Sequence, residues 1–493
     1  MIKKSVAILL SSLLTLTGCA QIKSETLTSL AQYQGQKLKW SDCYQNYQCS
    51  NLLVPIDYAD LKLGSFSLSI LRYEALDPDR RIGSLVVNPG GPGSSGVDYA
   101  YNAENLVSPE ILERFDIVGF DPRGVGESAP IKCLSNSETD ASFAADPKPD
   151  DAAELALFIS DVRDFYAKCA KKTKNLAHYS TLDSARDMEI LRYALGERKL
   201  NFLGKSYGTY LGTLYAELFP LNVGRFVLDG AVDPNSTNHE AVLGQAIGFD
   251  LALEAFLQDC LKRDTCSFSG DLADARVQIK QLLAKIATTP LESKSKREVT
   301  EGLVVIGIAS SLYDSASGWP LLRDAFKEAL IGQGDSFLEL ADQYSGRQKD
   351  GNYLNNENDA IQIIDCLDRS DLETVESVKA GAAEFAAKAP IFGPYLAFAG
   401  LACRYFPEAK QAEHIAINKL ETEPILIIGT TRDPATPYKW AQSLAKLFNS
   451  SVLITLDGDG HTGHGRGSKC VDSAVDRYLL TGITPKTALF CAK

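Results

Sequence analysis

The sequence predicts an α/β fold: a mostly parallel sheet with helices on both faces and a large helical insertion that forms a lid. Short apolar segments alternate with amphipathic segments of helical spacing in the first half of the chain, and this alternation returns near the C-terminus after a long helical stretch. Several apolar segments lack a polar face, as expected for strands buried on both sides of a parallel sheet. The composition, 45% hydrophobic and 23% charged over 493 residues, excludes a disordered chain and a polytopic membrane protein.

The first 18 residues are typical of a cleaved export signal. A basic start precedes an apolar run over residues 6–16, which is too short to span a bilayer, and the run ends in a Leu-Thr-Gly-Cys lipobox at Cys19. This segment is similar to bacterial lipoprotein signals, in which the cysteine is acylated and becomes the first mature residue. We therefore expect a chain exported to the cell envelope, on its periplasmic or cell-surface side, and anchored by lipid on Cys19. Residues 19–39 are polar and aperiodic, and we expect a mobile tether there.

The chain has eleven cysteines, and the lipobox accounts for the odd one. The other ten are expected to form disulfides, because an exported chain lies outside the reducing cytosol. Pairing of sequence neighbours would close short loops, but the sequence leaves the connectivity open. The neighbouring pairs are Cys43 with Cys49, Cys133 with Cys169, Cys260 with Cys266, Cys366 with Cys403 and Cys470 with Cys491. No CxxC pair occurs and the five histidines are scattered, so we predict neither a metal ion nor another cofactor.

The sheet domain is expected in two parts, residues 40–237 and 411–493, on either side of a helical lid over residues 238–410. The expected strands are 67–73, 83–87, 115–120, 200–203, 225–228, 424–429 and 451–456. The expected helices are 152–170, 181–195, 438–448 and 470–480 in the sheet domain, with 240–261, 272–286, 321–331 and 375–387 in the lid. Because the sheet pattern stops and then resumes, the insertion should lie beside one end of the sheet.

The sharpest motif is a Gly-x-Ser-x-Gly pentapeptide at residues 204–208, between a predicted strand and a predicted helix. A serine on such a tight turn is held in strained backbone geometry, and the glycines avoid collisions with the neighbouring strand and helix. The turn exposes the hydroxyl of Ser206, and the N–H of Tyr207 at the helix start points towards a substrate oxygen. The motif therefore predicts Ser206 as a nucleophile and Tyr207 as one donor of an oxyanion hole.

A glycine cluster at residues 88–96 directly follows the predicted strand 83–87. An oxyanion needs backbone N–H donors brought very close, which residues without side chains allow. Pro92 has no N–H, so Gly91 is predicted as the second donor. A plain β-turn is the alternative, whereas a phosphate-binding loop is disfavoured because no Gly-Lys-Ser/Thr closes the cluster.

A nucleophilic serine needs a histidine as general base. His461 lies in a glycine-flanked loop after the predicted strand 451–456 and is the predicted base. His464, three residues later, is its rival. The remaining histidines lie in helical or polar stretches and are expected at the surface: His178, His239 and His414.

The imidazole in turn needs a carboxylate that fixes its tautomer. Asp433 follows the predicted strand 424–429 in a proline-flanked turn and is the predicted acid, although an aspartate there could also simply cap a helix. Asp229 and Asp233, which follow another strand, are the alternative. Strand-end placement puts all these groups at the carboxyl edge of the sheet, where open α/β sheets bind ligands. The chain order Ser, Asp, His is that of α/β-hydrolases.

Five segments together resemble one family closely. They are residues 88–96, 115–128, 204–208, 433–437 and 460–462. Their order and spacing are similar to the secreted tripeptidyl aminopeptidases of the α/β-hydrolase fold, relatives of prolyl iminopeptidase that include envelope lipoproteins of mycobacteria. The resemblance spans most of the mature chain. It implies Ser206 as nucleophile, Asp433 as acid, His461 as base, and Gly91 and Tyr207 as oxyanion donors.

The lid offers candidates for substrate recognition. An exopeptidase must bind a free α-amine, and residues 357–366 resemble the lid segment that precedes a cysteine in this family. Glu357, Asp359 and Asp365 are therefore candidates, although a solvated acidic helix start explains each equally well. Lys205 stands where relatives often have a small residue, and its charge beside the nucleophile could alter the preferred substrate.

These features predict an exported serine hydrolase, an aminopeptidase that releases short peptides or residues from peptide N-termini through an acyl-enzyme. A carboxylester hydrolase with the same triad is the alternative, and a catalytically silent peptide-binding lipoprotein is a third possibility. The net charge of −13, without a basic patch, disfavours nucleic acid as a partner. The expected partners are a peptide substrate and the membrane that holds the anchor.

Overall fold

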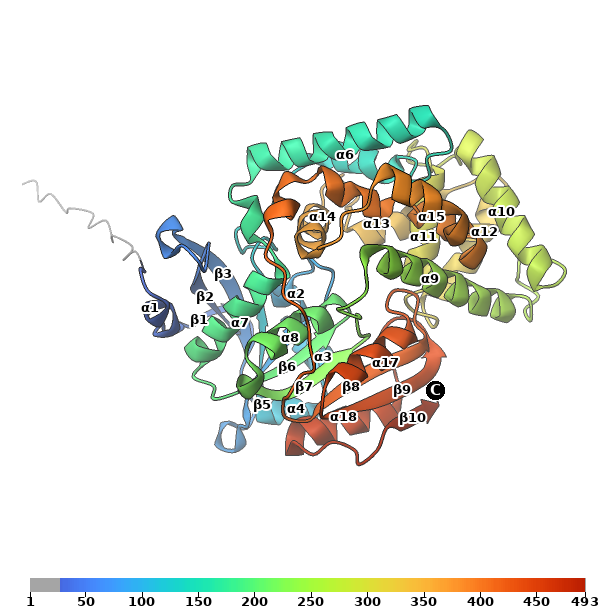
Figure 1. The fold of residues 1–493 in the computed structure, drawn as a ribbon. Helices are drawn as coiled ribbons and strands as arrows, with labels where there is room; N and C mark the ends of the chain where they lie inside the picture. Colours follow the sequence, from blue (N-terminus) through green and yellow to red (C-terminus); the bar gives the residue numbers. More distant parts are fainter. Residues whose placement is uncertain (1–26, 493) are drawn as a thin grey trace, which may run out of the picture.

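The computed structural model describes residues 27–492, so the predicted export signal and Cys19 lie outside the described residues. Its centre is one sheet with the strand order β1-β2-β3-β5-β4-β6-β7-β8-β9-β10, in which every neighbouring pair from β5 to β10 is parallel (Figure 1). The strands are β1 (Ser41–Tyr44), β2 (Tyr47–Pro55), β3 (Ser65–Tyr73), β4 (Gly83–Asn88), β5 (Phe115–Phe120), β6 (Leu200–Lys205), β7 (Val223–Asp229), β8 (Ile425–Arg432), β9 (Ser451–Asp459) and β10 (Leu489–Ala492). The mostly parallel sheet confirms the predicted fold class, whereas β1, β2 and β10 are not predicted by the sequence.

Helices cover both faces of this sheet. They are α2 (Gly96–Ala100), α3 (Ala103–Leu106), α4 (Pro109–Arg114), α7 (Thr181–Leu195), α8 (Tyr207–Leu218), α17 (Tyr438–Leu447) and α18 (Lys469–Thr481). Val86 of β4 packs in the apolar core beneath α7, α8 and α17, and its neighbours Leu85 and Val87 pack in the core beneath α2 to α4 and α18. Successive side chains of a strand point to opposite faces, so burial on both sides explains why these strands are apolar throughout.

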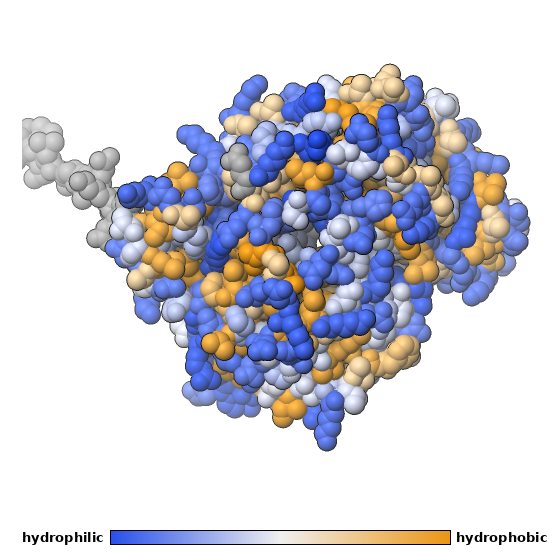
Figure 2. Space-filling model, viewed as in Figure 1, coloured by the Kyte–Doolittle hydropathy of each residue, from blue (hydrophilic) through white to orange (hydrophobic). Residues whose placement is uncertain are grey.

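The lid is a layer of helices beside the sheet with an apolar core of its own (Figure 1). Its helices are α5 (Asn136–Ala144), α6 (Ala152–Lys172), α9 (Asn238–Cys260), α10 (Leu272–Thr288), α11 (Glu301–Ser311), α12 (Gly318–Ala329), α13 (Asp335–Ser345), α14 (Glu357–Asp368), α15 (Val375–Lys388) and α16 (Gly393–Leu396). Figure 2 shows hydrophilic residues spread over one face of the molecule, apolar residues in small patches, and a hollow where lid and sheet domain meet.

The predicted domain boundaries place residues 136–172 in the sheet domain, whereas α5 and the first half of α6 pack against the lid; Tyr166 and Cys169 in the second half of α6 belong to the apolar cluster of the sheet domain. Leu155 of α6 shares an apolar cluster with Leu243 and Phe385 of lid helices, and Phe143 of α5 packs against the lid core. Helical spacing shows that a helix buries one face, but it does not identify the layer that receives this face.

The predicted mobile tether also differs from the structure. Its described part contains α1 (Leu30–Gln34), which begins at a capping box formed by Ser29 and Gln32. Tyr33 is fully buried and its hydroxyl lies 2.6 Å from Ser65 Oγ. Gln36 binds both backbone groups of Leu53 at 2.7 and 3.1 Å. A buried aromatic ring and a paired amide therefore dock this segment on β2 and β3.

Five disulfides join sequence neighbours, which is one of the connectivities that the sequence left open. They are Cys43–Cys49, Cys133–Cys169, Cys260–Cys266, Cys366–Cys403 and Cys470–Cys491. Within residues 27–492, no helix has the length and apolarity needed to cross a membrane. The same residues contain no group of three or more side chains placed to hold a metal ion.

Candidate active site

Ser206 occupies a sharp turn between β6 and α8. Its backbone angles, φ 54° and ψ −126°, are strained for a residue with a side chain. A Cβ on Gly204 would lie 2.5 Å from the carbonyl oxygen of Gly208, so the strand and helix approach this closely only with glycine at that position. The N–H of Ser206 donates to the carbonyl of Asp229 at 2.8 Å, which fixes the turn to the end of β7.

The glycine cluster passes directly over this turn. A Cβ on Gly90 would lie 2.8 Å from the carbonyl oxygen of Lys205 and 2.9 Å from Ser206 Cβ. The N–H of Gly90 is bound by Asn88 Oδ1 at 3.0 Å, and the next residue, Gly91, the predicted donor, is exposed. Tyr207 begins α8, so its N–H has no acceptor inside the helix. The two predicted oxyanion donors therefore belong to segments in direct contact.

His461 and Asp433 form a hydrogen-bonded pair. His461 Nδ1 lies 2.8 Å from Asp433 Oδ1 and 3.0 Å from Oδ2. The Asp433 side chain is fully buried, and it also accepts the N–H groups of Ala435, Thr436 and Thr462 at 3.0, 2.8 and 3.0 Å. These donors fix the carboxylate, and the carboxylate in turn directs Nε2 of the histidine away from itself.

Adjacent parallel strands bring the predicted site residues to one edge of the sheet. Ser206 follows β6, Asp433 follows β8 and His461 follows β9, while the glycine cluster follows β4. The His461 ring lies against Gly230, the residue after β7. Within the described residues Ser206 Oγ makes no hydrogen bond to the ring; in unliganded enzymes such bonds are often long and tighten when substrate binds.

The lid is joined directly to the histidine loop. The N–H of His461 donates to the carbonyl of Tyr313 at 2.9 Å, and the two rings pack edge to face with centroids 5.1 Å apart. Arg466 donates to the same carbonyl at 2.9 Å and pairs with Asp314 at 3.5 Å. Tyr313 is a residue that the motifs do not reveal, because it lies in the lid between the predicted helices 272–286 and 321–331 and belongs to none of the motifs.

Only one of the three acidic lid candidates reaches the site. Glu357, the first residue of α14, accepts a hydrogen bond from Ser94 in the glycine cluster, and burial raises the pKa of its carboxyl. Asp359 accepts the N–H of Cys133 at 2.7 Å and serves the fold. Asp365 pairs with Arg369 at 3.0 Å in the last turn of the helix. Glu357 is therefore the only one of the three that could meet a substrate.

The rival residues have other partners. Burial lowers the pKa of His464 to about 3, and its Nδ1 has no hydrogen-bond partner among the described residues, so the ring cannot take up a proton near neutral pH. Asp229 binds backbone N–H groups, and Asp233 caps its own turn at Asn235. The Lys205 ammonium donates to the carbonyl of His464 at 2.7 Å. It is directed away from Ser206, which argues against the direct influence on substrate considered from the sequence.

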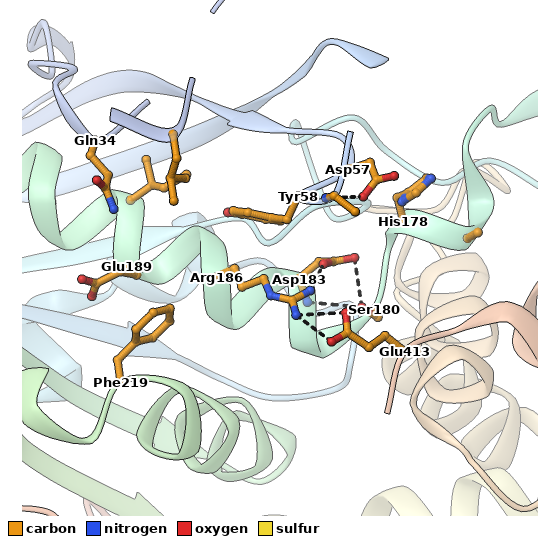
Figure 3. A pocket seen from close by; sticks show the side chains of 14 residues that line it. Gln34, Asp57, Tyr58, His178, Ser180, Asp183, Arg186, Glu189, Phe219 and Glu413 are labelled. Carbon is orange, nitrogen blue, oxygen red and sulfur yellow. Dashed lines mark hydrogen bonds and ion pairs between the residues drawn. The ribbon is translucent and has the colours of Figure 1, made fainter. Parts of the chain in front are cut away.

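A separate pocket of about 630 Å³ lies beside α7 (Figure 3). Arg186 crosses it and binds Asp183 and Glu413, each at 2.9 Å. None of the predicted site residues lines this pocket, and Arg186, which crosses it, is already paired with two carboxylates, so we assign it no part in the chemistry.

Comparison with known proteins gives relatives over nearly the whole chain. Residues 389–491 match the family described as TAP-like protein. The chain is 35% identical to serine protease Hip1 of Mycobacterium tuberculosis, over 97% of this chain and 95% of that protein. It is 30% identical to tripeptidyl aminopeptidase of Streptomyces lividans, over 92% and 86%. It is also 35% identical to carboxylesterase B of Mycobacterium tuberculosis, over 90% and 86%.

Proposed function

The chain belongs to the family of serine peptidases that includes serine protease Hip1 and tripeptidyl aminopeptidase, and on this premise we propose that it is an aminopeptidase that releases short peptides or single residues from peptide N-termini. The observation that carries the proposal is that Ser206, on its strained turn, and the hydrogen-bonded His461–Asp433 pair follow parallel strands of one sheet and so lie at the same edge. Each residue then has a defined role.

Ser206 is the nucleophile, and His461 is the general base that serves it. His461 Nε2 takes the hydroxyl proton as Ser206 Oγ bonds to the scissile carbonyl carbon, and it passes that proton to the departing amine as the peptide C–N bond breaks. The same nitrogen then deprotonates a water molecule, which cleaves the acyl-enzyme, and His461 returns this proton to Ser206 Oγ as the ester bond breaks. Asp433 keeps the proton of the ring on Nδ1 and stabilises the imidazolium.

The N–H groups of Gly91 and Tyr207 stabilise the oxyanion of each tetrahedral intermediate. The contact of the glycine cluster with the Ser206 turn supports this assignment, because it fixes both donors before substrate binds. Loss of one such donor typically costs about 3 kcal/mol of transition-state stabilisation.

Glu357 is the group that distinguishes an aminopeptidase from an esterase with the same triad. Its carboxylate lies beside the glycine cluster. The phenols of Tyr313 and Tyr344 are close enough that its negative charge contributes to their raised pKa. A carboxylate and electron-rich rings suit a substrate ammonium group.

Hydrolysis of peptide p-nitroanilides tests the proposal. Ser206→Ala should lower kcat/KM more than about 1,000-fold, while Ser137→Ala, the same change at an exposed position on α5, should leave it unchanged. Undiminished hydrolysis by the purified Ser206→Ala protein would refute the role of Ser206. N-acetylated peptides and short-chain esters complete the set: an aminopeptidase loses activity on acetylation, whereas preference for the esters would favour the activity that the name carboxylesterase B suggests.

We also propose that the enzyme is exported and held at the cell envelope by lipid on Cys19. The proposal rests on the lipobox sequence, since Cys19 lies outside the described residues. The wild-type chain expressed in a bacterium should incorporate labelled fatty acid and partition into detergent, and Cys19→Ala should do neither. Equal labelling of both proteins would contradict the anchor.

A further inference from the structure

Three polar side chains lie directly behind the candidate active site and take part in none of the steps above: Asp229 and His464, which are buried, and Lys205, which is largely buried. Asp229 is fully buried at the end of β7, and its two carboxylate oxygens accept the N–H of Gly463 at 2.8 Å and of His464 at 2.9 Å. Lys205 Nζ donates to the carbonyl of His464 at 2.7 Å and lies 3.9 Å from Asp229 Oδ2. The two charges therefore hold both backbone groups of His464.

This cluster is connected to the nucleophile and to the base. Lys205 directly precedes Ser206, and the carbonyl of Asp229 accepts the N–H of Ser206 at 2.8 Å. On the other side, the three peptide N–H groups that follow His461 all bind carboxylates, the first to Asp433 and the next two to Asp229.

The loop that receives these bonds has little rigidity of its own. It contains glycine at positions 460, 463, 465 and 467, three of them at positive φ, and the adjacent Thr462 also has a positive φ of 67°. Glycine gives the backbone conformational freedom that must be removed from outside. A buried ion pair contributes little to stability, because the desolvation of both charges offsets their attraction. Stability alone therefore does not explain why Lys205 and Asp229 are paired behind the active site.

We propose that Lys205 and Asp229 are positioning residues, a buried charge clamp that fixes the histidine loop, residues 460–467, and so holds His461 in register with Ser206. The inference rests on the roles proposed above for these two catalytic residues. The clamp touches no substrate. Loosening it should therefore lower kcat, which depends on the placement of the base, and leave KM nearly unchanged.

Substitution of either charge tests the clamp. In Asp229→Asn the side chain can accept only one of the two N–H groups and presents its own amide to the other. We expect kcat to fall about 100-fold, with KM within about threefold of wild type. Lys205→Met should have a similar effect, whereas Lys205→Arg keeps the cation and should restore most of the activity.

A matched control separates positioning from stability. Asp187 and Arg123 form a fully buried ion pair, at 2.6 Å, that contacts neither catalytic residue nor the histidine loop. Asp187→Asn should lower Tm and leave kcat unchanged. The double variant Asp229→Asn with Lys205→Met removes both buried charges, so Tm should recover relative to the single variants while kcat stays low. This double variant also serves if Asp229→Asn alone does not fold.

The outcomes are distinct. Wild-type kcat in Asp229→Asn, or recovery of kcat together with Tm in the double variant, would overturn the clamp. Ser206→Ala in the same assay separates this result from a failure of the proposed function. If Ser206→Ala is inactive and Asp229→Asn is fully active, only the clamp is wrong; if Ser206→Ala is active, the nucleophile itself is misassigned.

Discussion

At the scale of single residues, Glu357 is where the structure adds most to the sequence. We expect Glu357→Gln to raise KM for peptides with a free N-terminus roughly tenfold, because a partly buried carboxylate that binds an ammonium group contributes about 1–3 kcal/mol. Hydrolysis of N-acetylated peptides should change little. Steady-state kinetics on both substrate series checks this.

Asp365→Asn is the matched control for this prediction, since it removes the same charge from the last turn of the same helix, where it pairs with Arg369. It should leave both substrate series unchanged. An equal loss of activity on free and acetylated peptides in Glu357→Gln would mean that the residue supports the glycine cluster through Ser94 and does not bind the amine.

The sequence identifies site residues that need an unusual backbone conformation. It does not identify those that are distinguished only by the direction in which a side chain points. Ser206 and the glycine cluster are recognisable because a strained turn and a close approach demand glycines at fixed positions. His461 and His464 share one glycine-rich loop, and Asp229 and Asp433 both follow strands. Their environments distinguish them: one histidine meets a carboxylate, and the other is buried near the Lys205 cation, which disfavours a charged ring.

At the scale of elements, the central strands are predictable because both of their faces are buried, which leaves a continuous apolar run in the sequence. The strands β1 and β10 at the two edges of the sheet carry no such run. They are four residues long, and each contains a cysteine of a disulfide, Cys43–Cys49 and Cys470–Cys491. β1 pairs with β2 directly after it in the chain and β10 pairs with β9, so their positions follow from the strand and the disulfide beside them and not from an apolar pattern of their own.

The helices show the same limit. Their existence follows from local spacing, but the layer in which they pack is decided by distant contacts. Amphipathic spacing predicts α6 within two residues of its observed end, yet one part of its apolar face, at Leu155, meets α9 and α15 of the lid, and another, at Tyr166, packs in the core of the sheet domain. In the docked N-terminal segment a single buried ring, Tyr33, outweighs a polar neighbourhood that predicts mobility.

At the scale of the whole molecule, α14 joins the lid to the sheet domain at both of its ends. Glu357 meets the glycine cluster at the first turn. At the other end Asp368 accepts the N–H of Thr181 at 2.9 Å and its hydroxyl, and that hydroxyl also pairs with the phenol of Tyr207, the residue after the nucleophile. Asp368 is enclosed at this junction, and burial raises the pKa of its carboxyl to about 7.

This buried acid predicts how stability depends on pH. An aspartate titrates near 3.9 in the unfolded chain. The folded protein binds this proton more tightly, so the neutral carboxyl contributes favourably to the free energy of unfolding. That contribution is complete below about pH 3.9 and is lost as the pH rises through about 7, where the carboxyl ionises in the folded protein as well. The side chain of the Asp368→Asn variant stays neutral at every pH. The variant's free energy of unfolding relative to wild type should therefore rise by about 2.6 kcal/mol between pH 5 and pH 8. Urea denaturation of both proteins at each pH measures this difference, and Asp161→Asn, an exposed change on α6, should show none. Parallel pH dependence of wild type and Asp368→Asn would mean that the carboxyl is already ionised in the folded protein, and that the lid is not bound to the sheet domain through a neutral acid.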